Sequence, residues 1–382
     1  MLLVHLGFLL TGIVTTMLGP ILPVLAARWH LDDARAGYLF TLQFCSSTLG
    51  TAASSRFMQR IGSRNVMLAG FVLMSIGVGI LATGSWTALL LGISCYGLGL
   101  GFNLPATNLL VVSMFSQRRG AALNLINFAW SAGAVAAPPL FGVLLGQVPL
   151  STILTGVGIA IVAVALAIAA TMPHSIDKTA PQPGSAHSKW FPHTSVALLS
   201  VLLFVYIGTE TAIGGWLATY AQRMSVASLQ EASLVQAAFW GALLAGRGLG
   251  SLLLNRVRER DFLILSLGSA LCGVLVLLTS SHPAAIAGGS ILSGLGLAGV
   301  FPTAVAIMTA LFGAAAERRM GPIFATVGLG GAVIPWLVGQ ISKQFQDLRV
   351  GMAVCAFAIV GMLLLALRVA SAPAEAIAER LD

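Results

Sequence analysis

Long apolar runs alternate with short polar gaps along almost the whole chain. Each run has about 20 residues, which is enough to cross a hydrocarbon layer of roughly 30 Å as an α-helix. A transmembrane barrel would instead show segments of about 10 residues that alternate apolar and polar positions. The pattern therefore predicts an all-α membrane protein. Its twelve expected spans lie near residues 3–26, 36–57, 65–83, 87–115, 120–145, 151–172, 195–221, 231–254, 262–280, 284–312, 320–342 and 350–370.

One long polar stretch, "MPHSIDKTAPQPGSAHSKWFPH", divides the spans into six and six. The first span starts almost at Met1 without a basic flank or a cleavage site, so we interpret it as a retained helix. Its text "LGPILPVLA" predicts a kink, because proline interrupts helical hydrogen bonding. The predicted organisation is an N-terminal bundle at 1–172, a cytoplasmic linker at 173–194, a C-terminal bundle at 195–372 and a cytoplasmic tail at 373–382.

The two halves repeat each other in sequence. "GLGLGFNLPATN" at 97–108 is echoed by "GLGLAGVFPTAV" at 294–305, and "SSRFMQRIG" at 54–62 by "GSLLLNRVR" at 250–258. The pair Arg118 and Arg119 recurs as Arg318 and Arg319, and "GAVAAP" recurs as "GAVIP". These echoes predict two pseudo-symmetric six-helix bundles. This organisation resembles the major facilitator fold, in which solute binds near the membrane midplane between the halves.

Composition and charge agree with a membrane protein. Hydrophobic residues make up 57% of the 382 positions and charged residues only 8%, against roughly 25% charged in a soluble domain. If both termini are cytoplasmic, that side holds fourteen of the twenty Lys and Arg residues and the opposite side five. Orientation thus explains the net charge of +8. Because no compact basic face is interleaved with aromatic residues, we expect no nucleic-acid partner; the expected state is a monomer in the bilayer.

Motifs for metal binding or catalysis are not found. The four cysteines lie inside predicted spans without a CxxC or His-paired spacing, so we interpret them as small hydrophobes that fill helix contacts. The sequence has no HExxH and no GxSxG motif. We expect no metal, no cofactor and no enzymatic activity.

Two charged residues fall inside predicted spans. Eleven of the twelve acids lie in loops, at helix ends or in the tail, and the twelfth is Glu210 in "FVYIGTETAIGGWLATY". The only basic residue left inside a span is Arg247 in "WGALLAGRGLG". A charge at the bilayer centre costs about 2.5 to 3.5 kcal/mol and normally faces a protein interior or a wet cavity.

A desolvated carboxyl group favours its neutral form and can take up and release a proton. We therefore hypothesise that Glu210 couples protons to transport. Arg247 is permanently charged, so its expected role is to pair with Glu210 or to gate. The open alternative is a purely structural ion pair between spans seven and eight.

Polar and aromatic residues inside the spans suggest a binding site for a polyol. Amides donate and accept hydrogen bonds, and aromatic faces stack on the apolar side of a sugar ring. The alternative is that an Asn ties helices together and that a Trp near a helix end marks the membrane interface. The candidate substrate residues are Gln43, Asn103, Asn108, Asn127, Trp130, Trp216, Tyr220, Trp240, Trp336 and Gln340.

The text "YIGTETAIGGWLATY" resembles the Tyr-x-Gly-x-Glu pattern, followed by Gly-x-Trp and Tyr, of the fucose, galactose and glucose proton symporter family. "FWGALLAGRGLG", "GLGLAGVFPT" and "GGAVIPWLVGQIS" resemble the same family. The resemblance implies proton-coupled uptake of a hexose or related small polar solute by alternating access in a bacterial inner membrane. It places Glu210 and Arg247 at matching motif positions.

The sequence also departs from that family. The superfamily's acidic loop motif appears as Ser55-x-x-x-Gln59-Arg60-x-Gly62-Ser63-Arg64, with an amide in place of the acid. The expected gating residues are Arg60, Gly62, Arg64 and Arg256. The first span offers threonines where relatives often place an acid, which leaves an uncoupled sugar uniporter open. "SAGAVAAPPLFG" partly resembles an antiporter motif, so an export antiporter for drugs or metabolites also stays open.

Overall fold

The described part of the chain is helical throughout. The computed structural model describes residues 1–115, 117–172, 194–225, 227–253, 257–312 and 327–369. The first half comprises α1 Leu2–Thr16, α2 Leu18–Trp29, α3 Asp33–Ile61, α4 Ser63–Ala82, α5 Trp86–Met114, α6 Arg119–Leu144 and α7 Leu150–Thr171. The second half comprises α8 Thr194–Ser225, α9 Leu229–Leu253, α10 Glu259–Thr279, α11 Pro283–Ala298, α12 Val300–Phe312, α14 Gly330–Phe345 and α15 Leu348–Val369. The all-α prediction is confirmed.

Several predictions fall outside the described residues. The linker lies there except for Thr194, which begins α8, and so does the predicted tail at 373–382. Arg256 and the repeated pair Arg318 and Arg319 also lie outside.

Two predicted spans are broken helices. The first consists of α1 and α2, which meet at Met17, and the tenth consists of α11 and α12, which meet at Gly299. A proline follows each break by three residues, Pro20 in one case and Pro302 in the other. Proline donates no backbone hydrogen bond and its ring clashes with the carbonyl four residues earlier. The kink predicted for the first span is therefore confirmed, and its counterpart lies at the equivalent place in the second half.

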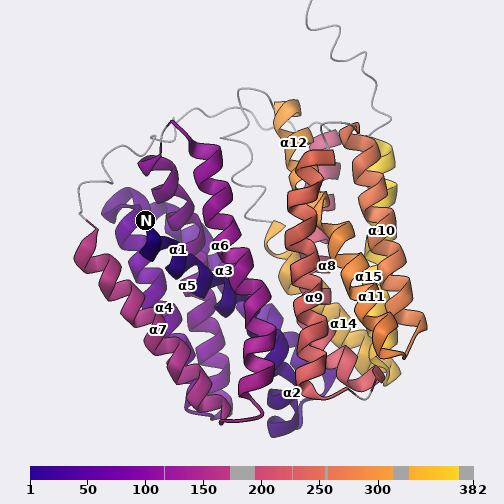
Figure 1. The fold of residues 1–382 in the computed structure, drawn as a ribbon, viewed down its shortest axis with the longest axis horizontal. Coiled ribbons are helices and arrows are strands. Elements are labelled where there is room, and N and C mark those ends of the chain that lie inside the picture. Colours follow the sequence, from indigo (N-terminus) through magenta and orange to yellow (C-terminus); the bar gives the residue numbers. More distant parts are fainter. Residues whose placement is uncertain (116, 173–193, 226, 254–256, 313–326, 370–382) are drawn as a thin grey trace, which may run out of the picture.

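The helices form two bundles that follow the order of the chain (Figure 1). Helices α1 to α7 pack on one another, as α4 with α5 and α1 with α6, and helices α8 to α15 do the same, as α10 with α11 and α8 with α14. The halves meet through α3 with α14, α6 with α9 and α2 with α8. Figure 1 shows the halves close together around α2 and diverging toward the end where the N-terminus lies.

The repeated glycines explain why the two bundles pack alike. A Cβ atom on Gly97 would lie 2.7 Å from the carbonyl oxygen of Gln43 in α3, and its counterpart Gly294 meets the carbonyl oxygen of Phe239 in α9. Gly99 faces a different helix: a Cβ atom on Gly99 would lie 2.6 Å from the backbone nitrogen of Met74 in α4. Small residues let helix backbones approach closely in the membrane. The sequence echo is therefore a repeated packing surface.

Nine helices among the described residues are long and apolar enough to cross a membrane. The other three predicted spans are α3, α9 and α14; α14 has only 16 described residues. All three take part in the contact between the halves, α3 with α14 and α9 with α6. Their neighbours on those faces are protein rather than lipid, which is why these helices tolerate more polar residues.

The contact between the halves has the same pseudo-symmetry. The side chain of Gln236 in α9 meets Gly19 in α2, and the ring of Phe40 in α3 meets Gly215 in α8. The two pairs are equivalent positions of the repeat, because Gly215 lies 196 residues after Gly19 and Gln236 lies 196 residues after Phe40. Glycine is needed at both places because any side chain would collide with the opposing residue. The two halves thus touch through the same surface twice.

Candidate functional site

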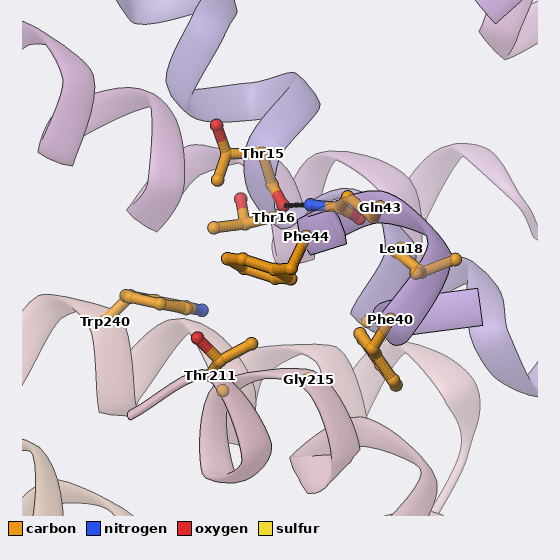
Figure 2. Close-up of a pocket in the computed structure, with 11 residues that line it drawn as sticks. Thr15, Thr16, Leu18, Phe40, Gln43, Phe44, Thr211, Gly215 and Trp240 are labelled. Atoms are coloured by element: carbon orange, nitrogen blue, oxygen red, sulfur yellow. Dashed lines mark hydrogen bonds between the residues drawn. The ribbon is translucent and has the colours of Figure 1, made fainter. Parts of the chain in front are cut away.

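A pocket lies between the two halves at the break between α1 and α2 (Figure 2). Its empty volume, with the space open to solvent included, is about 330 Å³. The N-terminal half contributes residues of α1, α2 and α3, and the C-terminal half residues of α8 and α9. The lining residues are Thr15, Thr16, Leu18, Gly19, Phe40, Gln43, Phe44, Thr211, Gly214, Gly215 and Trp240.

Glycines of α8 shape the pocket wall. A Cβ atom on Gly215 would lie 2.6 Å from the ring of Phe40, and one on Gly214 would collide with the ring of Trp240. Two aromatic rings from opposite halves therefore lie directly on the backbone of α8. The sequence analysis missed Phe40, Phe44, Gly214 and Gly215. The sequence signal for this wall was the internal repeat, which places Gly19 and Gly215 at equivalent positions 196 residues apart.

The described residues that line this pocket include no charged side chain. Figure 2 shows the nitrogen edge of the Trp240 indole turned toward the pocket, which Thr211 also lines. Within the described structure the Trp240 Nε1 atom is buried and makes no hydrogen bond. A buried donor without a partner is unfavourable unless a ligand or water accepts from it. The pocket thus offers donors, hydroxyls and aromatic faces to a neutral solute.

Gln43 lines the pocket, but its amide also connects helices. Its Nε2 atom donates to the carbonyl oxygen of Thr15 at 2.9 Å, and its Oε1 atom accepts from the hydroxyl of Tyr96 at 2.9 Å. Thr15 in turn donates to the carbonyl oxygen of Thr11 at 2.7 Å. These bonds fix the polar wall of the N-terminal half around the break between α1 and α2.

Trp130 in α6 is not among the lining residues, but it packs against Trp240, which is. Its ring lies 6.5 Å from that of Trp240, nearly perpendicular to it, so the pair bridges the two halves. In the described structure the Nε1 atom of Trp130 is also buried and makes no hydrogen bond. The structure therefore brings Trp130 and Trp240 together, as two predicted substrate residues from different bundles.

The three asparagines do not converge on one point. Asn103 is fully buried inside the N-terminal bundle, where its Oδ1 atom accepts from Thr11 at 3.1 Å and its Nδ2 atom donates to the carbonyl oxygen of Met67 at 3.2 Å. Asn108 accepts from Asn127 at 3.4 Å, and the side chain of Asn127 is exposed. Asn103 ties α1, α4 and α5 together, and its assignment to the substrate site stays a prediction.

The other candidates lie between helices of the second half or against α3. Trp216 is fully buried and donates to the carbonyl oxygen of Pro335 at 3.1 Å, and Tyr220 is fully buried and donates to the carbonyl oxygen of Leu277 at 2.5 Å. The ring of Trp336 lies 6.4 Å from that of Tyr38, and Gln340 is partly buried on α14. None of these four lines the pocket, and their assignment to it stays a prediction.

Glu210 and Arg247 form an ion pair, as the sequence suggested. The Nη2 atom of Arg247 lies 3.5 Å from Oε2 of Glu210, and the two side chains are 32% and 10% exposed. The hydroxyl of Tyr206, one turn earlier in α8, donates to the same oxygen. Residues four apart share a helix face, so Tyr206 and Glu210 both point toward α9. Thr211, the next residue, faces the pocket instead.

The predicted gating residues lie at the junction of α3 and α4. Gly62 has φ +83° and ψ 158°, a backbone conformation that is essentially restricted to glycine. Arg64 is buried and donates to the carbonyl oxygen of Ala169 near the end of α7 at 2.8 Å, where the helix dipole favours a cation. Arg60 is exposed at the end of α3. The gating role of all three stays a prediction.

A cluster of ion pairs that the sequence analysis did not find joins α3 to α8 and α14. We call it the α3–α14 cluster; its members are Asp32, Asp33, Arg223, Ser342 and Lys343. Arg223 donates to both carboxylate oxygens of Asp33 at 2.8 and 2.9 Å, Ser342 donates to Asp33 at 2.5 Å, and Lys343 lies 2.9 Å from Asp32. In the sequence these residues were visible only as charges near the ends of predicted spans, with nothing to show which of them pair.

The electrostatics of the cluster favour the ionised carboxylate of Asp32. Partial burial acts to raise its pKa, but hydrogen bonds from the Lys343 ammonium and from the backbone of Arg35 outweigh it, so the pKa lies below its usual value. Asp32 therefore remains charged and paired with Lys343 well into mildly acidic solution. The cluster holds the two halves together at one end of the molecule.

A family model of the Major Facilitator Superfamily matches residues 4–283 and, in an overlapping second match, residues 199–380. The Glucose/galactose transporter of Brucella abortus biovar 1 is 23% identical over 361 residues, which cover 88% of this chain and 85% of that protein. Multidrug efflux protein YfmO of Bacillus subtilis is 25% identical over 347 residues, with coverages of 86% and 83%. Protein TsgA homolog of Erwinia tasmaniensis is 25% identical over 244 residues, and the chain spans about three fifths of its length, 61%.

Solved structures share the fold. A bacterial homolog to the human lysosomal transporter Spinster, in an inward-facing and occupied conformation, superposes with a TM-score of 0.79 at 14% identity, covering 97% of this chain and 94% of that one. The transporter FucP in the outward conformation superposes with a TM-score of 0.64 at 17% identity, with coverages of 96% and 97%. With the family model covering most of the sequence and two repeated bundles meeting around a central pocket, the chain belongs to the major facilitator superfamily.

Proposed function

We propose that this protein is a secondary active transporter that carries a hexose or related small polar solute together with a proton, by alternating access between its two bundles. The observation that supports the proposal best is the arrangement of α8. Thr211 faces the neutral pocket, while the preceding residue, Glu210, pairs with Arg247 behind the pocket wall. Solute and proton thus have separate places on consecutive residues of one helix.

This arrangement provides a physical route to coupling. A change in the charge of Glu210 alters its attraction to Arg247 on α9, and α8 and α9 both line the pocket. A ligand or proton shifts a conformational equilibrium only if it interacts differently with the two states. We expect the ionised and protonated forms of Glu210 to favour different packings of α8 against α9.

Exchange of Glu210 for Gln tests the proposal. Glutamine mimics the protonated acid, so we expect proton-driven accumulation in proteoliposomes to disappear while counterflow exchange of solute continues within about threefold of the original rate. Glu259→Gln, the same change at an exposed position at the start of α10, should leave both activities intact. Loss of folded Glu210→Gln protein that Arg247→Gln rescues would favour a structural ion pair instead. Uptake driven by a sodium gradient instead of a proton gradient would identify sodium as the coupling ion.

Export of drugs or metabolites is the second candidate, because Leu18, Phe40, Phe44 and Trp240 give the pocket a largely apolar wall. Such a wall suits flat apolar compounds as well as sugar rings. A growth panel of cells expressing the protein, combined with a thermal-shift screen against monosaccharides, nucleosides and drugs, separates the two. Drug resistance without stabilisation by any monosaccharide would replace uptake by export.

A further inference from the structure

Tyr206 holds the carboxylate of Glu210 in one orientation. It is fully buried, and its hydroxyl donates to Oε2 of Glu210. The Arg247 guanidinium lies on this same Oε2 atom, at 3.5 Å. Two donors from two helices therefore converge on one carboxylate oxygen. Among the described residues the hydroxyl of Tyr206 donates to no other group, so its bond to Glu210 satisfies this buried donor.

A carboxyl group uses its two oxygens differently in its ionised and protonated states. An ionised carboxylate accepts on both oxygens, whereas a neutral carboxylic acid carries its proton on one oxygen and keeps the other as an acceptor. Because Tyr206 and Arg247 both donate to Oε2, that atom remains the acceptor in either state. A proton taken up by Glu210 would then be placed on Oε1. On protonation, one O–H bond forms at Oε1, the charge of the carboxylate is lost, and the attraction of Arg247 weakens.

A neighbouring ring keeps Tyr206 in place. Phe301 lies with its ring centroid 6.0 Å from that of Tyr206. It belongs to α12, directly after the break at Gly299. Aromatic pairs of this kind contribute beyond simple area burial. The hydroxyl of Tyr206 is thus held by Glu210 on one side while its ring packs against the broken span on the other.

Few other charges act on this carboxyl group. In the described structure Glu210 forms an ion pair only with Arg247, and helices α11 and α12 contribute no titratable side chain. The charged residues of α2, α14 and α15 near the opposite end have partners of their own: Arg28 with Gly84, Lys343 with Asp32 and Arg349 with Ser281. Tyr206 and Arg247 are accordingly the two side chains that contact the Glu210 carboxylate within the described part of the chain.

We infer that Tyr206 is a positioning residue for proton coupling: by donating to Oε2 it stabilises the ionised form of Glu210 and directs protonation to Oε1. The inference rests on the proposed function, since it assigns a role within the same coupling site. It adds a residue that the sequence analysis did not select, even though Tyr206 stands in the quoted motif.

Replacement of Tyr206 by Phe tests this role through the pH profile. Without the Tyr206 hydroxyl, the ionised carboxylate of Glu210 loses a hydrogen-bond donor, so Glu210 should keep its proton up to a higher pH. We expect the pH midpoint of concentrative uptake to rise by roughly 0.4 to 1 pH unit, the equivalent of one net hydrogen bond. Tyr38→Phe is the control, because it removes a tyrosine hydroxyl from α3, in the other half, on a side chain that is largely exposed. That control should leave the midpoint unchanged.

A second variant applies if Tyr206→Phe does not fold. Site-specific 3-fluorotyrosine at position 206 retains the hydroxyl and makes it a stronger donor, so the midpoint should move to lower pH. In the Glu210→Gln background, neither change at position 206 should produce a pH midpoint, and one that persists there would contradict the assignment to Glu210.

Two results distinguish a failure of the positioning role of Tyr206 from a failure of the proposed function. An unchanged midpoint in folded Tyr206→Phe protein, with Glu210→Gln still uncoupled, overturns the positioning role and leaves the proposed function in place. Undiminished uphill uptake by Glu210→Gln overturns both.

Discussion

At the scale of single residues, Glu210 is tolerated in the membrane because its surroundings match its charge. An isolated charge there costs about 2.5 to 3.5 kcal/mol. Arg247 and Tyr206 supply two donors to one oxygen, and the side chain of Arg247 remains about one third exposed, at 32%. Partial solvation of the arginine reduces the cost of the pair relative to full burial. An exchangeable charge can therefore persist within an apolar bundle.

The indole nitrogen of Trp240 provides a residue-scale prediction. Trp240→Phe keeps an aromatic ring against Gly214 but removes the buried donor that faces the pocket. We expect solute binding, measured by calorimetry, to weaken by about 3- to 10-fold, which corresponds to one neutral hydrogen bond.

Trp216→Phe is the contrasting variant. Its indole donates to the Pro335 carbonyl between α8 and α14, so its loss should lower the melting temperature while solute affinity stays within about twofold. An affinity loss as large as that of Trp240→Phe would contradict the division between pocket and packing residues drawn from the structure.

At the scale of helices, the contact between the halves combines a symmetric and an asymmetric part. Close approach of α3 to α14 at Gly37 and Gly339 has its counterpart where α6 meets α9 at Gly142 and Ser233. The ion pairs of the α3–α14 cluster have no such counterpart, because residues shifted by 196 from Asp32 and Asp33 are Ser228 and Leu229. Charge therefore strengthens one of two geometrically similar contacts.

Asp33→Asn should loosen the cluster. The change removes the charge-assisted bonds to Arg223, a loss of roughly 1 kcal/mol or more. We expect the fraction of molecules separated at this end to rise several-fold, as measured by electron-paramagnetic distances between labels at the exposed positions Arg35 and Gln346 in a cysteine-free background. The charge-swapped pair Asp33→Arg with Arg223→Asp should restore the original distribution. If the single variant keeps that distribution, the cluster does not stabilise this contact.

At the scale of the whole molecule, the arrangement supports movement of the two bundles as units. Among the described residues, contacts within each half are extensive, whereas the halves meet mainly through three helix pairs. Tightly packed glycines make each bundle internally stiff, and the central pocket lies where both bundles contribute residues. Rocking of one bundle against the other is the motion expected of such an architecture.

Alternating access predicts opposite changes at the two ends. The pair Arg35 and Gln346 reports on the end with the α3–α14 cluster, and Asn124 with Leu249 reports on α6 and α9 toward the other end. With solute and a proton gradient, one distance distribution should lengthen while the other shortens. Labels at Arg60 and Asn124, within one bundle, should show no change. A single distribution for both pairs under all conditions would exclude the rocking motion.

The sequence alone was sufficient for the features that depend on hydrophobicity and repetition. Apolar runs of membrane-spanning length predicted the helices, because a lipid environment leaves few other structures available. The spacing between "GLGLG" and "GLGLA" predicted related halves, since the glycines are required wherever backbones approach closely. Glu210 and Arg247 were identified because charges inside spans are rare, and their pairing follows from adjacent spans.

Only the tertiary structure decided which side of each helix meets which neighbour. A helix that is apolar all round has no polar face to indicate its orientation, so the sequence could not separate Gln43, which lines the pocket, from Asn103, which is enclosed within one bundle. The ion pair of Asp33 and Arg223 joins residues 190 positions apart. Such contacts depend on how the bundles meet, and that is determined by three-dimensional packing rather than by local pattern.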